Sequence, residues 1–185
     1  MATNPEIRTE GEAVAAEHPL VARLRTGVAN AVLASQAFRG DATAIVPRAK
    51  LHDVCRFLRD DAELRFDMLV DVTAVDYLGR VPRFEVVYHL YSVPLNHRIR
   101  IKVALDESDP SLPSLVPVWV GANWLERETW DLYGIVFDGH PDLRRIYLYE
   151  EFQGHPLRKD YPKTKRQPLI GPGAASSACA EGSGR

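Results

Sequence analysis

The chain has 185 residues, of which 45% are hydrophobic, and its 23 basic side chains nearly balance its 25 acidic ones, for a net charge of −2. This size predicts one domain with a hydrophobic core plus extensions. The balanced charge argues against broad nucleic-acid binding, which is typical of strongly basic domains. The two cysteines, Cys55 and Cys179, are too few for the four thiolates of an ordinary iron–sulfur cluster and do not suggest a disulfide framework.

Residues 1–18 are expected to be flexible. They carry Glu6, Glu10, Glu12 and Glu17, lack the apolar core of a signal peptide, and are too acidic for a mitochondrial transit peptide. No apolar run approaches the length that spans a bilayer. We therefore expect a soluble protein made in the cytoplasm, with any membrane association arising through a partner.

The first part of the chain is predicted to form two helices and two strands. Their expected bounds are residues 19–38 for the first helix, 43–46 for a short strand, 51–64 for an amphipathic helix and 66–75 for a largely buried strand. The first helix should end near Gly40, and Pro47 should stop the short strand. Cys55 has helical spacing with Leu51 and Leu58, which predicts a buried apolar role for it.

Residues 83–91 and 97–105 give the clearest strand signals, because apolar side chains alternate along both. A short loop separates them, which predicts a hairpin. One face of this hairpin should be apolar and meet the helices. The other face of the second strand bears Arg98, Arg100 and Lys102, so it should be wet or face an acidic partner.

After a proline-rich turn at residues 109–113, residues 123–134 predict the most informative helix. Asn123 is its predicted N-cap, Glu126 completes a capping-box spacing, and Gly134 suits a left-handed C-terminal cap. Two tryptophans, two leucines and a tyrosine share this helix with four charged groups, so it lacks a clean division into apolar and polar faces. This pattern indicates packing by more than one neighbour, and therefore an assembly.

Residues 135–137 look like a short strand, and the proline- and charge-rich residues 138–168 predict an extended arm that cannot build its own core. Residues 169–185, which include Cys179, are rich in small residues and are expected to be disordered. The order of elements predicts an α+β fold, with a two-layer core domain over residues 19–137. Its small mixed or antiparallel sheet should be packed by helices.

The chain lacks the motifs of common cofactor and catalytic sites. None of its 12 glycines forms a phosphate-binding loop, and its six histidines are scattered. It also lacks the nucleophile-elbow motif. We therefore predict no catalytic residue, no cofactor-binding residue and no metal ligand on this chain.

The remaining candidates are four charged residues of the predicted helix and a following histidine: Glu126, Arg127, Glu128, Asp131 and His140. In an enzyme, Glu128 and Asp131 would form an acid/base dyad near the histidine. In a purely structural role, the charges would pair locally, for instance Arg127 with Asp131. In an interaction site, Arg127 would grip a partner carboxylate while Trp124 and Trp130 fill pockets.

The run from Gly154 to Pro162 also has two interpretations. Five basic residues stand between His155 and Arg166 against one acidic residue, as in a solvated tail. The prolines and Tyr161 equally suit an extended arm that lies in another protein's groove.

Two motifs carry a family resemblance. The first is ERExxDLY, from Glu126 to Tyr133, followed by His140 and Arg144, and the second is the arm motif GHPLRKDYP. They resemble the signature of the C-subunit family of the proton-pumping NADH:quinone oxidoreductase, respiratory complex I. Two upstream stretches, FLRDD with RFDML and RFEVVYHL, are similar too.

The resemblance implies a peripheral-arm subunit on the cytoplasmic side of a bacterial cell membrane. The chain would hold no cofactor, whereas partner subunits would carry FMN and iron–sulfur clusters. The complex would pass electrons from NADH to quinone and translocate protons, while the isolated chain would be inactive. The chain would pack beside the D subunit and near the cluster-bearing B and I subunits, and it would meet NADH and quinone only through the complex.

The resemblance further implies that the signature residues bind partner subunits. They are Trp124, Glu126, Arg127, Glu128, Trp130, Asp131, His140, Arg144, His155, Arg158, Lys159, Asp160 and Tyr161. One alternative is the equivalent subunit of a related membrane-bound hydrogenase or of a ferredoxin- or deazaflavin-dependent complex. A more distant alternative is a stand-alone acid/base enzyme that uses Glu128 and Asp131.

Overall fold

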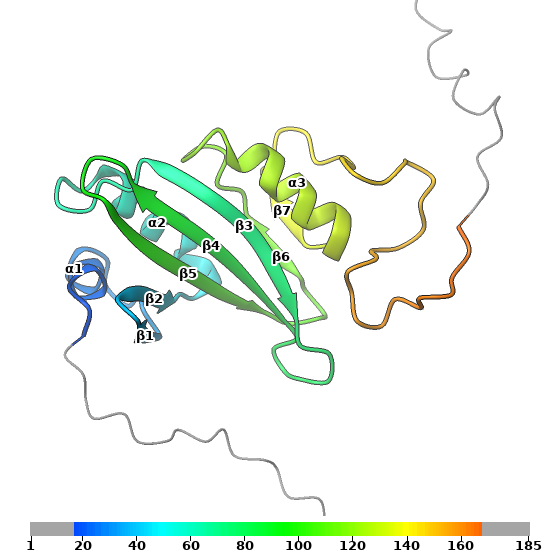
Figure 1. The fold of residues 1–185 in the computed structure, drawn as a ribbon, viewed down its shortest axis with the longest axis horizontal. Helices are drawn as coiled ribbons and strands as arrows, with labels where there is room; N and C mark the ends of the chain where they lie inside the picture. The colour runs from blue at the N-terminus through cyan, green and yellow to red at the C-terminus, as the bar shows by residue number, and fades with distance from the viewer. Residues whose placement is uncertain (1–16, 168–185) are drawn as a thin grey trace, which may run out of the picture. The chain divides into compact units, whose positions relative to one another are not determined.

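The computed structural model describes residues 17–167. The predicted flexibility of residues 1–16, the predicted disorder of residues 169–185 and the interpretation of Cys179 lie outside the described residues. Within residues 17–167, five strands form one sheet in the order β1-β2-β5-β4-β3, and two short strands form a second pair (Figure 1). The first sheet is mixed and accompanies three α-helices, so the predicted α+β fold is confirmed.

The helices and strands follow one another without a long gap as far as residue 138. In chain order they are α1 (Pro19–Gly27), β1 (Ala34–Phe38), β2 (Asp41–Ile45), the short 3-10 helix η1 (Arg48–Lys50), α2 (Leu51–Asp60), β3 (Met68–Asp76), β4 (Phe84–Ser92), β5 (His97–Leu105), β6 (Ser111–Pro113), α3 (Ala122–Tyr133) and β7 (Val136–Asp138). No helix within residues 17–167 is long and apolar enough to cross a membrane.

The prediction of one helix over residues 19–38 is wrong. Helix α1 stops at Gly27, where an added Cβ would lie 2.0 Å from Cζ of Phe57, so the backbone passes close to that ring. Strand β1 then pairs antiparallel with β2 through a turn in which Arg39 and Gly40 have φ values of 51° and 89°. Helical spacing misses this pairing because tertiary contacts override local propensity.

Helix α2 ends at Asp60, before the predicted end of the amphipathic helix. Asp61 takes an extended conformation, with ψ of 130°, and its carboxylate pairs with Arg23 at 2.6 Å. An extended residue at the C-cap ends the helical hydrogen-bond ladder. The prediction that Cys55 is buried is confirmed.

The predicted hairpin is confirmed in β4 and β5, and β5 has the predicted bounds. The apolar residues of β5 are buried, whereas Arg98 is exposed and Arg100 and Lys102 are half-buried. The prediction of a largely buried strand is wrong for the first half of β3, where Met68 and Val70 are 47% and 49% exposed.

Helix α3 begins after Gly121, so the predicted N-cap at Asn123 is wrong. The N–H groups of Ala122 and Asn123 donate to the carbonyls of Trp119 and Val120 at 2.9 and 3.2 Å. These turn hydrogen bonds satisfy N–H groups that a side-chain cap would otherwise serve. The predicted C-terminal cap is confirmed, because Gly134 is left-handed with φ of 73°. Strand β6 lies in the predicted turn and pairs parallel with β7.

The chain divides into two compact units. Within the described residues, the first unit comprises residues 17–71 and 87–104, and the second comprises residues 72–86 and 105–167. Each unit has fully buried apolar side chains, such as Leu58 in the first and Phe84 in the second. All residues of the family signature belong to the second unit. The boundary between core domain and arm at residue 137 stays a prediction.

Candidate functional site

The site is built on α3 and on the segment after β7, which runs beside this helix without regular structure (Figure 1). Glu126 is fully buried on the inner side of α3. Its Oε1 accepts the N–H of Leu115 at 2.6 Å, and its Oε2 accepts the hydroxyl of Ser114 at 2.7 Å. Burial raises the pKa of Glu126 to about 7, although both hydrogen bonds oppose that shift. Glu126 therefore fixes the segment between β6 and α3.

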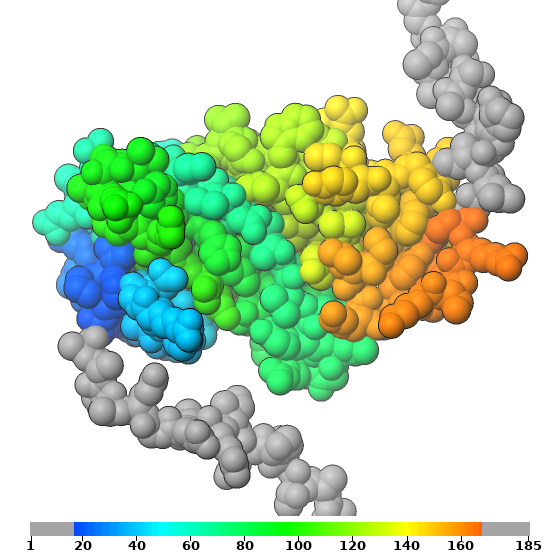
Figure 2. All heavy atoms as spheres, in the orientation of Figure 1, coloured from blue at the N-terminus to red at the C-terminus, as the bar shows by residue number. Residues whose placement is uncertain are grey.

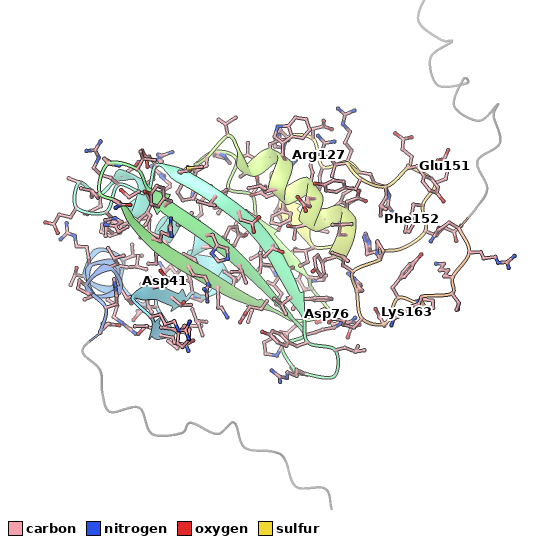
Figure 3. All side chains as sticks on the ribbon, viewed as in Figure 1. Asp41, Asp76, Arg127, Glu151, Phe152 and Lys163 are labelled. Atoms are coloured by element: carbon pink, nitrogen blue, oxygen red, sulfur yellow. The ribbon has the colours of Figure 1, made fainter. Side chains whose placement is uncertain are left out.

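Arg127 points toward the segment after β7 (Figure 3). Its Nε donates to the carbonyl of Arg144 at 3.1 Å, and its Nη2 donates to the carbonyl of Arg145 at 3.0 Å. The guanidinium also lies 5.0 Å from the ring centroid of Trp124. The local pairing of Arg127 with Asp131 considered from the sequence is replaced by these contacts, because each group has its own partner in the later segment.

Asp131 is the fully buried anchor of that segment. Its Oδ1 accepts Nη1 of Arg145 at 2.6 Å, and its Oδ2 accepts the N–H groups of Ile146, Tyr147 and Leu148 at 3.1, 2.9 and 3.0 Å. Burial opposes ionisation of this carboxyl, but the three backbone N–H groups and Arg145 outweigh it and lower its pKa. The carboxylate thus holds its charge while it organises a turn.

The acid/base dyad gains no support from this geometry. Asp131 has four donors on its two oxygens, and Glu128 faces the hydroxyl of Tyr147 at 3.5 Å. His140 is engaged at both ring nitrogens, since Nε2 donates to the carbonyl of Asn123 at 3.1 Å and Nδ1 accepts the N–H of Asp142 at 3.0 Å. Asp131 and His140 therefore hold backbone in place, while Glu128 contacts a side chain.

The arm motif is fastened to the C-terminal end of α3. His155 donates from Nδ1 to the carbonyl of Asp131 at 2.9 Å, and Arg158 donates from Nε to the carbonyl of Tyr133 at 2.5 Å. Burial lowers the pKa of His155, so its neutral form is favoured. A Cβ on Gly134 would lie 2.5 Å from Cδ2 of His155 and 2.8 Å from Nη2 of Arg158. The absence of a side chain at Gly134 therefore permits this contact.

A buried arginine, Arg83, ties the arm to the ends of β3 and β4. It donates from Nε and Nη2 to Asp76 at 2.9 Å each, and from Nη1 to Glu107 at 2.5 Å. Asp160 lies 3.0 and 3.2 Å from Nη2 and Nη1. Asp76 also accepts the N–H of Lys159 at 2.8 Å. Arg83 holds the pKa values of Asp76 and Asp160 below their usual range.

Other signature side chains remain open to solvent. Trp124 is 61% exposed, and the side chain of Arg144 is 70% exposed and pairs with Asp142 at 2.9 Å. Lys159 is exposed too, whereas Trp130 is half-buried with its ring 6.5 Å from that of His155. The structure therefore divides the signature into groups that bind their own chain and groups that remain available to a partner.

Sequence reasoning missed three residues of the site. Arg145 stands in a stretch without periodicity, Asp76 follows the predicted strand over residues 66–75, and Arg83 is the first residue of the predicted strand over residues 83–91. Arg83 belongs to the RFEVVYHL stretch of the family resemblance, but that resemblance implies no role for it. The partners of Arg83 lie as far as 77 residues away, a separation at which no local pattern predicts pairing.

The first unit contains a hollow of about 260 Å³, lined in part by Asp41, Asp71, His89, Arg98 and Arg100. Burial and the neighbouring Arg100 lower the pKa of His89. The expectation of a wet or partner-facing basic strand stays a prediction. Within residues 17–167, no three His, Cys, Asp or Glu side chains gather so that they could hold a metal ion.

Comparisons with known proteins agree with one another. Residues 44–167 match the family described as respiratory-chain NADH dehydrogenase, 30 Kd subunit. The chain is 56% identical over 140 residues to the C subunit of NADH-quinone oxidoreductase from Roseiflexus sp. (strain RS-1), which covers 76% of this chain and 80% of the relative. It is also 54% identical over 150 residues to the C subunit of the same enzyme from Roseiflexus castenholzii, covering 80% and 86%.

Two solved structures are similar as well. A trypsin-resistant fragment of Nqo5 has a TM-score of 0.53 and 36% identity, covering 60% of this chain and 89% of the fragment. A chain in the membrane-bound sulfane sulfur reductase, an archaeal respiratory membrane complex, has a TM-score of 0.67, covering 78% of this chain and 85% of its own. Its identity is 23%, so this second likeness concerns the fold alone.

Proposed function

Because the chain belongs to the family of the respiratory-chain NADH dehydrogenase 30 Kd subunit, which is the C subunit of complex I, we propose that it is a scaffold subunit without a cofactor of its own. In this role it serves an enzyme that transfers electrons from NADH through FMN and iron–sulfur centres to quinone and couples this transfer to proton translocation. FMN and the clusters reside on partner subunits. The chain meets NADH and quinone only through the complex.

The observation that carries the scaffold role is the use of the signature charges. Three of them, Glu126, Arg127 and Asp131, form hydrogen bonds with backbone groups and side chains of their own unit. A catalytic group needs a titratable atom within reach of a substrate. These three groups instead fix the path of the segments on either side of α3, which is what a platform for other subunits requires.

The partner contacts are assigned to the exposed members of the signature. Trp124, Arg144 and Lys159 present a ring and two cations to solvent, and exposed aromatic and arginine side chains are frequent anchors at interfaces. The buried members act behind them by holding the backbone that carries them. We assign these contacts to the D subunit first, and to the cluster-bearing B and I subunits, on the cytoplasmic side of a bacterial cell membrane.

Purification tests both parts of this function. The full chain, expressed alone and offered flavin, iron and sulfide, should bind neither cofactor and should not oxidise NADH. The tagged chain should co-purify with the other complex I subunits from gently solubilised membranes. Stoichiometric flavin or iron absorbance would contradict the cofactor-free role, and co-purification with hydrogenase subunits would favour the related membrane complex.

A further inference from the structure

Residues 153–167, which we call the basic loop, close on themselves. Oε1 of Gln167 accepts the N–H of Gln153 at 3.0 Å, and Nε2 of Gln167 donates to the carbonyl of Gln153 at 3.2 Å. Nζ of Lys165 donates to the same carbonyl at 3.1 Å. The two ends of the loop are therefore joined by contacts within the described chain.

The interior of the basic loop is filled. The ring of Tyr161 stacks on that of Phe152 with centroids 6.1 Å apart, and Nε2 of Gln167 donates to its hydroxyl. Gly154 has φ of 100°, and a Cβ there would lie 3.1 Å from the Tyr161 ring. Arg145 adds a hydrogen bond from Nη2 to the carbonyl of Phe152 at 2.8 Å. The loop is thus packed against itself and against the segment that Asp131 anchors.

The basic loop carries an excess of positive charge, and the cations without a partner in the described chain are exposed to solvent. It contains five Lys and Arg residues against one acidic residue, Asp160, and Asp160 is bound by Arg83. Arg158 and Lys165 donate to carbonyl groups. The charged groups of Lys159, Lys163 and Arg166 are exposed and make no hydrogen bond or ion pair with residues 17–167. Figure 2 shows this part of the chain in orange on the surface, and Figure 3 labels Lys163 on it.

We propose that the basic loop is a preformed docking element that binds an acidic surface of a partner subunit through Lys159, Lys163 and Arg166. This inference rests on the proposed function and deepens it by naming the chemistry of the partner. Preforming reduces the ordering cost of association, because the loop does not have to fold as it binds. Outward cations then steer the encounter with a surface of opposite charge.

A protein surface suits this loop better than a lipid or nucleic-acid surface. Polybasic membrane attachment uses clusters of about 4–8 Lys and Arg residues, more than the three outward cations here. Nucleic-acid binding is typical of strongly basic domains, whereas this chain has a net charge of −2. Three cations on a closed loop match the scale of an acidic patch on a neighbouring subunit.

The test adds full-length chain to the complex prepared from a strain that lacks this chain's gene. The test variant K163E/R166E reverses two outward cations and spares the Lys159 amide that Asp76 holds. The control variant R56E/R80E reverses two exposed cations elsewhere on the chain and changes the net charge equally. We expect K163E/R166E to bind at least about tenfold more weakly than wild type at low ionic strength, with the difference shrinking as salt is added. The control should bind like wild type.

Equal binding by wild type and both variants would overturn the docking role and leave the proposed function intact. Failure of the wild-type chain to bind the incomplete complex would overturn the proposed function itself. Binding of wild type, but not K163E/R166E, to phosphatidylserine vesicles with unchanged assembly would replace the protein partner by a lipid. Hydrogen exchange adds a separate check: unprotected amides at Leu157, Arg158 and Tyr161 in the isolated full chain would overturn the claim that the loop is preformed.

Discussion

Glu126 makes the stability of the folded chain depend on pH, and a substitution at this one residue can reveal its contribution. Its pKa of about 7 in the folded chain lies above its ordinary value of 4.5, so the folded state binds more protons than the unfolded state between these values. Its contribution to stability is therefore greatest below pH 4.5 and is lost as the pH rises to about 7. This loss amounts to about 3 kcal/mol at 1.36 kcal/mol per unit.

We predict that Glu126→Gln flattens this part of the stability profile. A neutral amide keeps an acceptor for the Leu115 N–H, and it has no charge to bury. Urea unfolding between pH 4.5 and 7.5 should show wild type losing about 3 kcal/mol relative to the variant as the pH rises. Glu128→Gln, at a half-buried position, is the matched control. Parallel profiles for wild type and Glu126→Gln would mean that the buried carboxyl stays ionised.

Arg83 should contribute more to stability than any exposed cation of the second unit. Arg83→Ala leaves Asp76, whose side chain is 0% exposed, as a buried charge without its partner. We predict a loss of roughly 3–5 kcal/mol in the free energy of unfolding, measured by urea titration. Arg80→Ala, which removes an exposed cation over the Tyr77 ring, should change stability little. Comparable losses for both would show that the ion cluster contributes nothing special.

At the scale of elements, the sequence predicts strand β5 better than it predicts where the helices begin and end. The alternation in β5 fixes both its bounds and its buried face, because a period of two assigns each side chain to a face. The prediction of the first helix is wrong because Val32 and Leu33 continue the helical spacing of apolar residues, although α1 has ended at Gly27 and the chain goes on to form β1. The start of α3 fails because backbone turns, rather than Asn123, satisfy its first N–H groups.

A substitution at Gly134 tests how much the contact between α3 and the arm contributes to stability. Gly134→Ala places a Cβ 2.5 Å from His155 and adds left-handed strain of about 1–2 kcal/mol. Gly79→Ala shares that strain, since Gly79 has φ of 87° with nothing within 4 Å of an added Cβ. We predict that Gly134→Ala destabilises the chain by about 1–3 kcal/mol more than Gly79→Ala, for the broken hydrogen bonds of the arm. Equal effects in urea unfolding would indicate that the arm moves aside freely.

At the scale of the whole molecule, the fold class follows from the order of elements, but the pairing does not. The parallel pairing of β2 with β5 sets Ala42 opposite Ile99, and β6 pairs with β7 across α3. Such registers depend on contacts between distant segments. For the same reason the charged residues of α3 could be chosen as candidates, and Arg144 through the family resemblance, while the partners at residues 145–148 could not.

Truncation after Phe152 tests the second half of the arm, which contains the basic loop. It removes Asp160 and the Lys159 N–H from the Arg83 cluster but retains Arg145 and the backbone that binds Asp131. We predict a cooperative melt with a midpoint lower by roughly 4–8 °C, for a loss of about 2 kcal/mol. The D subunit should no longer co-purify with the shortened chain.

Truncation after Gln167 is the control for this experiment. It keeps the basic loop, so it should retain both the melting temperature and the co-purification of wild type. If the chain cut after Phe152 assembled at wild-type levels, residues 153–167 would be dispensable for binding.

The Arg83 cluster also sets an order in time. Synthesis releases Asp76 and Arg83 early, then the residues of the first unit from 87 to 104, then Glu107, and Asp160 only 77 residues after Arg83. Domains tend to fold as they emerge, beginning at the N-terminus. The first unit can therefore be complete while the second still lacks the carboxylate that closes its ion cluster. The arm that we propose to face partner subunits is then the last part of the described chain to be secured, so we expect a nascent chain to become competent for assembly only after residue 160 has been synthesised.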